Sequence, residues 1–307
     1  MTEPLLEIRN LSVGVALGRD HVIPILKQVS FQIMPGEIFG LVGESGSGKS
    51  VTSLAAMGLL KKPLAITGGQ ILFQGKDLLK ASKREMRTLR GNRIAMIFQE
   101  PMTALNPLAT VGRQVAEMFV LHQGKSWAEG KKLAIEALRS VRVPNPERRA
   151  ADYPHQMSGG LRQRVMIAMA LACNPDLLIA DEPTTALDVT VQAEVLRLIK
   201  ELCTERGTAV LFISHDLGVV ASLCQRVGVM YGGCLLEEDW TAELFANPRH
   251  EYTRGLLGAL PMLGSRAAHG RQRLVDIDSI IADRSALTKT RFIAPRDEVP
   301  SLNGGRT

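Results

Sequence analysis

The sequence predicts an α/β fold in which a strand-rich N-terminal part and an inserted helical part accompany a parallel sheet. Three observations support this prediction. Residues 1–98 contain short apolar runs bounded by turn signals, residues 111–172 have the apolar spacing of helices, and residues 177–246 alternate between the two patterns. Such alternation is typical of parallel strands that are connected and covered by helices. The 307 residues, 45% of them hydrophobic and 22% charged, suit a globular chain of one or two domains.

The individual elements follow from local patterns. In the first part, strands are predicted over residues 5–13, 25–33, 38–42, 70–73 and 94–98, with turns at Pro35-Gly36 and Gly68-Gly69. The inserted part is predicted to contain helices over 111–121, 126–141 and 158–173. The last part is predicted to contain strands over 177–180, 209–213 and 226–231, and helices over 189–205, 217–224 and 241–246. After about Met262 the periodicity is weak, so an appended and partly mobile extension is expected.

Composition argues against several classes of protein. The sequence has no run of eighteen apolar residues, so the chain is not expected to span a membrane by itself. The N-terminal residues carry acids and lack the pattern of a secretory signal, which predicts a cytoplasmic location. The four cysteines are widely spaced, so we expect free and mostly buried thiols rather than a zinc site or a disulfide framework. The net charge of +6 is spread along the chain, which favours a solvated basic surface over a nucleic-acid site.

The most informative motif is Gly43-Glu44-Ser45-Gly46-Ser47-Gly48-Lys49-Ser50, which fits G-x-x-x-x-G-K-[ST] at every fixed position. It joins a predicted buried strand to a predicted helix, as a phosphate-binding loop requires. The glycines let backbone N–H groups converge on phosphate oxygens, and the helix dipole adds positive potential there. Lys49 is expected to reach the terminal phosphates, and the Ser50 hydroxyl to ligate Mg²⁺. The alternative is a glycine-rich turn without a ligand, which the strand and helix context disfavours.

Two carboxylates end the predicted strand over 177–180. A nucleotide-binding sheet presents acids at this edge, where Asp181 is expected to contact the Mg²⁺ shell. Glu182 is expected to polarise a water for attack on the γ-phosphate. A strand that ends in Asp-Glu usually just leads into a turn exposed to solvent. The phosphate loop elsewhere in the chain favours the functional interpretation here.

A third motif, Met157-Ser158-Gly159-Gly160-Leu161, opens a predicted helix. Together with the phosphate loop and the carboxylates it resembles the ATP-binding subunits of ABC transporters. It approximates their L-S-G-G-Q signature, with Met157 in place of Leu and Leu161 in place of Gln. The resemblance covers most of residues 5–261 and implies that Ser158, Gly159, Gly160 and Leu161 face the γ-phosphate held by a partner subunit.

The resemblance also implies roles for further single residues. Gln99 matches the glutamine that senses Mg²⁺ and touches the membrane subunits, and Asp188 matches the aspartate that lies across the dimer interface. His215, in LFISHD, matches the histidine that holds the γ-phosphate and the attacking water. Val51, directly after the loop, joins the expected nucleotide-binding residues. Gln99 and His215 would each be ordinary polar residues if considered singly, and their order and spacing favour the functional interpretation.

Two segments narrow the resemblance to one branch of the family. Residues 99–107 (QEPMTALNP) and 250–257 (HEYTRGLL) are similar to segments of oligopeptide, dipeptide and nickel importers. This implies an ATP-hydrolysing subunit that uses ATP and Mg²⁺ to power import, with peptides as the favoured solute and nickel or another small solute as the alternative. It also implies a related but distinct second ATP-binding subunit, two integral membrane permeases and an external solute-binding protein, at the cytoplasmic face of the inner membrane. Nucleic acid is not expected as a partner.

The resemblance implies a P-loop NTPase cassette of the ABC type for residues 1–261. This fold has an N-terminal antiparallel β subdomain, a mixed or parallel core sheet with helices, and a helical subdomain inserted at about residues 100–172. Residues 262–307 form a C-terminal extension whose role stays open. The chain departs from the family at Val15, where an aromatic ring usually stacks on adenine, so weaker or less base-selective nucleotide binding is predicted.

Two alternatives from other classes are weaker. A soluble ABC ATPase of DNA repair or translation would carry a long coiled coil or tandem cassettes, and the sequence has one phosphate loop and no such heptad run. An inactive cassette is disfavoured because Lys49, Asp181, Glu182 and His215 are all present.

Many relatives have a C-terminal cysteine cluster that in some holds an iron–sulfur centre, but no cysteine follows Cys234, so no such cofactor is expected.

Overall fold

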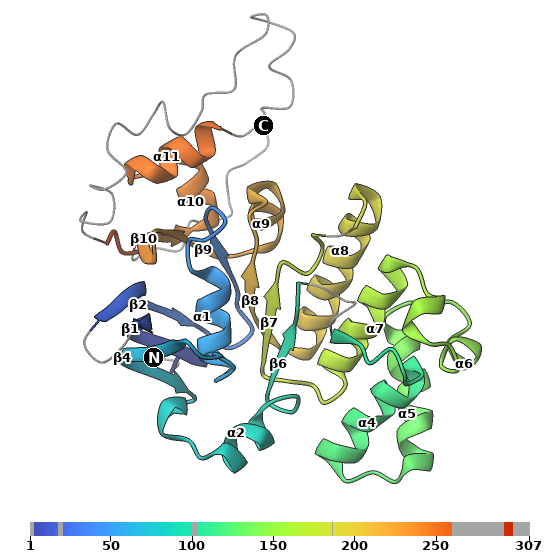
Figure 1. The fold of residues 1–307 in the computed structure, drawn as a ribbon. Coiled ribbons are helices and arrows are strands. Elements are labelled where there is room, and N and C mark those ends of the chain that lie inside the picture. Colours follow the sequence, from blue (N-terminus) through green and yellow to red (C-terminus); the bar gives the residue numbers. More distant parts are fainter. Residues whose placement is uncertain (1–2, 18–20, 100–103, 186, 260–291, 297–307) are drawn as a thin grey trace, which may run out of the picture.

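A computed structural model describes residues 3–17, 21–99, 104–185, 187–259 and 292–296 of the chain. Its N-terminal part forms a four-stranded antiparallel sheet (Figure 1). The strands, in spatial order, are β2 (His21–Ile33), β1 (Leu6–Leu17), β4 (Leu64–Phe73) and β5 (Lys76–Asp77). Strands β1 and β4 are longer than predicted because Val15 pairs with both Ile23 and Leu64 beyond the irregular register near Val13. The predicted antiparallel subdomain is confirmed.

The second sheet has six strands and carries the ends at which the predicted site residues lie. In spatial order it contains β10 (Cys234–Trp240), β9 (Arg226–Tyr231), β3 (Ile38–Val42), β8 (Ala209–Ile213), β7 (Leu177–Asp181) and β6 (Ile94–Ile97). All neighbours are parallel except β10, which is antiparallel to β9. Every residue of β3, β7 and β8 is buried, which explains why these strands read as continuous apolar runs.

Helices cover the second sheet and form a lobe beside it (Figure 1). Near the sheet lie α1 (Lys49–Ala56), α8 (Val189–Arg206) and α9 (Leu217–Leu223), and the lobe consists of α4 (Val111–Gln123), α5 (Trp127–Ser140), α6 (Pro146–Arg149) and α7 (Gly159–Leu171). The lobe agrees with the predicted helical insertion, although residues 100–103 at its start lie outside the described residues. Within the described part of the chain, no helix combines the length and the apolar composition that crossing a bilayer demands.

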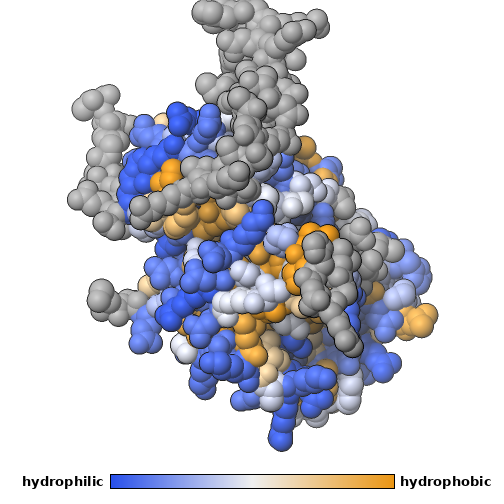
Figure 2. Space-filling model, turned by 60° about the vertical axis from the view of Figure 1, so that its left-hand side comes forward, coloured by the Kyte–Doolittle hydropathy of each residue, from blue (hydrophilic) through white to orange (hydrophobic). Residues whose placement is uncertain are grey.

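Two apolar cores hold these layers together. One lies between the two sheets and includes the stacked rings of Phe31 and Phe39, whose centroids are 5.1 Å apart. The other joins the large sheet to the helical lobe. On the face shown in Figure 2, hydrophilic residues surround limited apolar areas, as expected for a chain that is 45% hydrophobic with its apolar side chains largely packed inside.

Besides short elements such as β5 and α6, three longer elements are absent from the sequence-based expectations. These are α2 (Lys83–Leu89), which begins with a capping box between Ser82 and Glu85, strand β10, and α11 (Glu251–Gly258), which follows α10 (Thr241–Ala246). The pattern of residues 250–257 resembles the importer family but does not by itself indicate a helix. In addition, the thiols are less buried than expected, since Cys203 and Cys224 are buried but Cys173 and Cys234 are only partly so.

Strand β10 escapes prediction because it buries three successive acids, Glu237, Glu238 and Asp239, which are 0%, 3% and 0% exposed. Their cations come from other elements of the chain: Arg226 pairs with Glu238, Arg249 with Asp239 at 3.0 Å, and Arg296 with Asp239 at 3.5 Å. Ile293 adds a short parallel bridge to β10. Part of the predicted mobile extension is therefore packed on the cassette, whereas residues 262–291 and 297–307 lie outside the described residues.

Candidate functional site

The phosphate loop, residues 43–50, joins β3 to α1 as predicted. Three of its glycines have positive φ angles, 149° at Gly43, 80° at Gly46 and 105° at Gly48, which glycine adopts readily. A Cβ atom at Gly43 would lie 2.1 Å from the carbonyl oxygen of Met230. The loop is thus packed against the end of β9, and this close approach requires glycine at position 43.

The N-terminus of α1 is open to a ligand. Gly48 occupies the N-cap position, and no side chain caps the helix there. The first N–H groups of a helix have no intrahelical acceptor, and the helix dipole makes this end favourable for anions. A chain of phosphates fits this cradle because it supplies acceptors for these N–H groups.

Lys49 lies inside the loop and not in solvent. It is 5% exposed, and its Nζ donates hydrogen bonds to the carbonyl oxygens of Gly43 and Glu44, both at 2.8 Å. Burial lowers the pKa of Lys49, and the nearby carboxylates of Glu182, Asp181 and Glu44 oppose that shift. The side chain of Lys49 is thus held against the backbone of the loop, at a position from which it can contact a phosphate.

The Asp181 carboxylate faces α1 across a short gap. Ser50 Oγ donates to Asp181 Oδ1 at 3.0 Å, and Ser53 Oγ donates to Asp181 Oδ2 at 3.3 Å. Burial raises the pKa of Asp181, while the two serine hydroxyls oppose that shift. A hydroxyl and a carboxylate are oxygen ligands of the kind that Mg²⁺ prefers, so Ser50 and Asp181 could hold a magnesium ion, which would neutralise phosphate charge there.

Three adjacent parallel strands bring the remaining polar residues together. Gln99 follows β6, Glu182 follows β7 and His215 follows β8, and these strands are neighbours in the sheet. Because the carboxyl ends of parallel strands meet at one edge, the three side chains converge. Gln99 Nε2 donates to Glu182 Oε2 at 3.0 Å, and His215 Nδ1 lies 3.2 Å from Glu182 Oε1. Thr185 Oγ1 also donates to Glu182 Oε2 at 2.9 Å.

The backbone at Glu182 supports this convergence. Its φ of 47° is left-handed, an uncommon conformation for a residue with a side chain, and it ends β7 in a sharp turn. The Glu182 side chain is 16% exposed, while that of His215 is 58% exposed. Glu182 is therefore held by three partners at the mouth of the site, and His215 lies on its solvent side.

The Ser158–Leu161 segment lies apart from the phosphate loop of the same chain. Ser158 Oγ accepts a hydrogen bond from the Leu161 N–H at 3.4 Å and caps α7. A Cβ atom at Gly160 would lie 2.7 Å from Val191 Cγ1, so the segment packs on the start of α8. No hydrogen bond among the described residues joins it to residues 43–50. Ser158 and Gly159 are exposed, so this helix N-terminus is accessible to another molecule.

Asp188 performs a local structural task. Its Oδ1 accepts from the Val191 N–H at 3.0 Å and caps α8. Asp188 itself is exposed, and the next residue, Val189, is 83% exposed. Ala186, two residues before Asp188, lies outside the described residues.

The structure adds site contacts that the sequence reasoning missed. Ser53 hydrogen-bonds Asp181, Thr185 hydrogen-bonds Glu182, and the Tyr252 hydroxyl accepts from the Glu44 N–H at 3.4 Å. Ser53 could have been found, because a residue three positions after Ser50 lies on the same face of a helix. Thr185 and Tyr252 leave no comparable local signal.

Two sequence-based predictions concern features that the chain is expected to lack, an aromatic ring for adenine and an iron–sulfur centre. Val15 lies half-buried in β1 opposite Ile23, and its position is aliphatic as the sequence requires. Within the described part of the chain, no group of three or more His, Cys, Asp or Glu side chains is arranged to hold a metal. The expectation that no iron–sulfur centre is bound stays a prediction.

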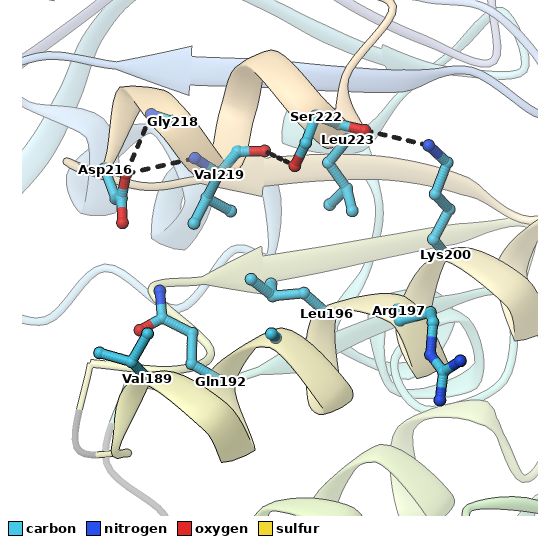
Figure 3. A pocket seen from close by; sticks show the side chains of 11 residues that line it. Val189, Gln192, Leu196, Arg197, Lys200, Asp216, Gly218, Val219, Ser222 and Leu223 are labelled. Carbon is cyan, nitrogen blue, oxygen red and sulfur yellow. Dashed lines mark hydrogen bonds between the residues drawn. The ribbon is translucent and has the colours of Figure 1, made fainter. Parts of the chain in front are cut away.

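A groove of about 490 Å³ between α8 and α9 lies next to the site but lacks its chemistry (Figure 3). Leu196 and Leu223 line it, and Lys200 Nζ donates to the Ser222 carbonyl oxygen at 3.0 Å. Its one carboxylate, Asp216, already accepts from the Gly218 and Val219 N–H groups and caps α9. The phosphate loop is therefore the better candidate for the functional centre.

Comparison with known proteins agrees with this geometry. The family model described as ABC transporter matches residues 26–185. The chain is 54% identical over 278 residues to a probable peptide ABC transporter ATP-binding protein of Sinorhizobium fredii, covering 90% of this chain and 82% of that protein. It is 51% identical over 262 residues to the oligopeptide transport ATP-binding protein OppD of Bacillus subtilis, covering 85% and 73%.

Solved structures show the same fold. The dimeric, post-hydrolysis state of the ATP-binding cassette MJ0796, bound to ADP and Pi, superimposes with a TM-score of 0.68 at 30% identity, covering 77% of this chain and 98% of that one. The predicted fold class and the predicted ATPase class are both confirmed. The chain therefore belongs to the ABC transporter family, as one of its ATP-binding proteins with the ATPase cassette.

Proposed function

We propose that this protein is the ATP-hydrolysing subunit that powers an importer of peptides. The observation that carries the proposal is the convergence of Gln99, Thr185 and His215 on Glu182, next to the phosphate loop. The solute is inferred from the relatives, several of which are named as peptide, oligopeptide or dipeptide transport proteins. Nickel or another small solute is the alternative cargo.

In this proposal residues 43–51, from Gly43 to Val51, hold the triphosphate. Their N–H groups would donate to phosphate oxygens, and Lys49 would exchange its carbonyl partners for phosphate oxygens. Ser50, Asp181 and Gln99 would hold Mg²⁺, directly or through water. The bound metal would neutralise charge on the β- and γ-phosphates. Domain boundaries at residue 261 and at about 100–172 belong to the same proposal.

The catalytic role falls to Glu182. Its carboxylate would orient and polarise a water for in-line attack on the γ-phosphate. His215 and Gln99 would hold that carboxylate and the water in register, since both lie within 3.2 Å of Glu182. The neighbouring Lys49 would offset the negative charge that develops during transfer.

The exposed Ser158–Leu161 segment would complete the site of a partner subunit. The helix N-terminus at Ser158, with Gly159, Gly160 and Leu161, would approach the γ-phosphate held by the partner, and Asp188 would lie at the seam. The dimeric form of the similar cassette MJ0796, bound to ADP and Pi, supports this arrangement. We expect the partner to be a related but distinct ATP-binding subunit.

A groove beside Gln99 offers a surface for the permeases. It has a volume of about 300 Å³ and lies between the sheet and the helical lobe. Its lining is apolar and rich in methionine, and it includes Phe98, Met57, Met96, Met118, Met166 and Met169. Flexible thioethers adapt to varied apolar partners. We propose that one of the importer's two integral membrane permeases docks here at the cytoplasmic face of the membrane, with an external solute-binding protein delivering the cargo.

Replacing Glu182 tests the proposed chemistry. In Glu182→Gln the side chain keeps its shape but loses the negative charge, so turnover is expected to fall at least about 100-fold while ATP still binds. The matched control is Glu205→Gln, which removes an exposed carboxylate from α8. Near-normal hydrolysis by Glu182→Gln would reject the role.

Reconstitution tests the cargo. The complex that co-purifies with this protein should contain two membrane proteins, and in proteoliposomes its ATPase rate should rise with peptide-loaded binding protein. Stimulation by a nickel salt and not by peptides would select the alternative cargo. Absence of any membrane partner would reject the transport function.

A further inference from the structure

We infer that Tyr252, on the C-terminal helix α11, is a positioning residue for the phosphate loop. The inference rests on the proposed binding of ATP at residues 43–50. Tyr252 lies 208 residues after Glu44, yet its hydroxyl oxygen accepts the hydrogen bond of the Glu44 N–H at 3.4 Å. It thereby fixes the second residue of the loop from outside.

Tyr252 is packed in the interior of the protein. The residue is 0% exposed, and its ring lies 4.6 Å from that of Tyr231, measured between centroids. Tyr231 ends β9 and is followed by the turn to β10. This turn contacts the phosphate loop, because the Gly233 N–H donates to the Ser47 carbonyl oxygen at 3.1 Å. The β9–β10 turn thus packs against the phosphate loop, and Tyr252 packs against Tyr231 at the start of that turn.

The phenol remains protonated at ordinary pH. Burial, together with the nearby negative charge of Glu44, raises the pKa of Tyr252. A neutral hydroxyl can accept from the Glu44 N–H without placing a charge beside the phosphates. The raised pKa therefore favours the neutral hydroxyl that this contact uses.

Helix α11 is itself anchored at its N-terminus by the buried Glu237. The carboxylate oxygens of Glu237 accept from the N–H groups of Arg249, at 2.8 Å, and His250, at 3.0 Å. His250 Nδ1 in turn accepts from the Tyr252 N–H at 3.1 Å. Burial lowers the pKa of His250, which favours the neutral imidazole that this acceptor role requires.

The segment from Phe292 to Arg296 reinforces the anchor. The Ala294 carbonyl oxygen accepts from Arg249 Nη2 at 2.6 Å, and Arg296 pairs with Asp239 of β10. A continuous set of contacts thus runs from the C-terminal segment through β10 and α11 to the Glu44 N–H. This path gives the helix after the nucleotide-binding core a task at the nucleotide site.

Removing the hydroxyl tests the inference in the full-length protein. Tyr252→Phe keeps the ring packing but leaves the Glu44 N–H without its acceptor, so the loop is less ordered before ATP binds. We expect Kd and KM for Mg-ATP to rise about fivefold, which corresponds to about 1 kcal/mol. The kcat should stay within about twofold, because the partners of Glu182 are unchanged.

The matched control is Tyr231→Phe, which removes a hydroxyl from the other ring of the pair. Among the described residues no hydrogen bond involves that hydroxyl, so Kd, KM and kcat should equal those of the wild type. A merely structural role of Tyr252 would lower Tm and leave Kd and KM unchanged.

Unchanged Kd in Tyr252→Phe, an equal rise in both variants, or a loss of kcat alone would each overturn the inference. Failure of the wild type to bind ATP would instead reject the proposed function.

Discussion

Replacing Arg226 by methionine should destabilise the protein strongly and in a pH-dependent manner. The Arg226 guanidinium is buried between two carboxylates: it pairs with Glu238 and lies 3.4 Å from Glu37 Oε1. It also donates to the Gln32 carbonyl oxygen at 3.1 Å and stacks over the Phe39 ring. Methionine is of similar length and keeps the packing, so Arg226→Met chiefly removes the charge.

The expected loss of unfolding free energy follows from the protonation of the two acids, Glu37 and Glu238. Burial raises the pKa of both, that of Glu238 to about 7, and the charge of Arg226 opposes both shifts. Loss of that charge should therefore require one further proton to bind to the two carboxylates on folding. From an ordinary pKa of 4.5, this costs about 3.4 kcal/mol at pH 7 and about 0.7 kcal/mol at pH 5. The expected loss at pH 7 agrees with the range of about 3–5 kcal/mol for broken buried ion pairs.

A raised native pKa means that the folded protein binds protons more tightly than the unfolded chain. The stability associated with Glu37 and Glu238 is therefore fully present below pH 4.5 and is lost as the pH rises through the raised native pKa values. Arg226→Met raises these values further, so the variant should lose more stability than the wild type between pH 5 and pH 7.

Urea unfolding at pH 5 and pH 7 checks this, followed by circular dichroism and by the fluorescence of Trp240, which ends β10. The control is Arg139→Met, which breaks an ion pair with Glu147 whose side chains are 57% and 61% exposed. It should cost less than about 1 kcal/mol at either pH. Adding Glu238→Gln to Arg226→Met should recover part of the loss. Equal destabilisation at both pH values, or a loss at pH 7 no larger than that of the control, would refute the reasoning.

Two further predictions concern the nucleotide site. Val15→Tyr should lower the Kd for ATP several-fold, because an aromatic ring adds about 1 kcal/mol of stacking on adenine, and an unchanged Kd by isothermal titration would count against the stacking argument. Gly43→Ala should weaken ATP binding by more than about tenfold, since its new methyl group would lie 2.1 Å from the Met230 carbonyl oxygen. Gly46→Ala shares the positive φ but meets no atom within 4 Å, so it should bind ATP more tightly than Gly43→Ala, and the opposite order would contradict the packing account.

The phosphate loop and the strand ends were predictable because each depends on local sequence. The motif around Lys49 lies between a buried strand and a helix start, and the residues after three parallel strands must share one edge of the sheet. The convergence of Gln99 and His215 on Glu182 therefore needed only the strand order in addition. The fold class followed from the same alternation of strands and helices.

What the sequence could not reveal depends on contacts between residues on different elements. Glu237, Glu238 and Asp239 have the composition of an exposed turn, and only Arg226, Arg249 and Arg296 make them a buried strand. Periodicity carries no information about such pairing. Tyr252 likewise shows an ordinary apolar helix position, and nothing near it in sequence indicates that it touches Glu44.

The order in which the chain is synthesised should delay the burial of the acidic strand β10. A ribosome extends the protein from its N-terminus, so β10 is made before Arg249 and well before Arg296. Until those cations arrive, Glu237 and Asp239 are carboxylates without the partners that let them enter the core, and charges of this kind resist burial. The nascent cassette should therefore complete its sheet edge late, and chains cut short before Arg296 should be recognised by cellular proteases in preference to full-length ones.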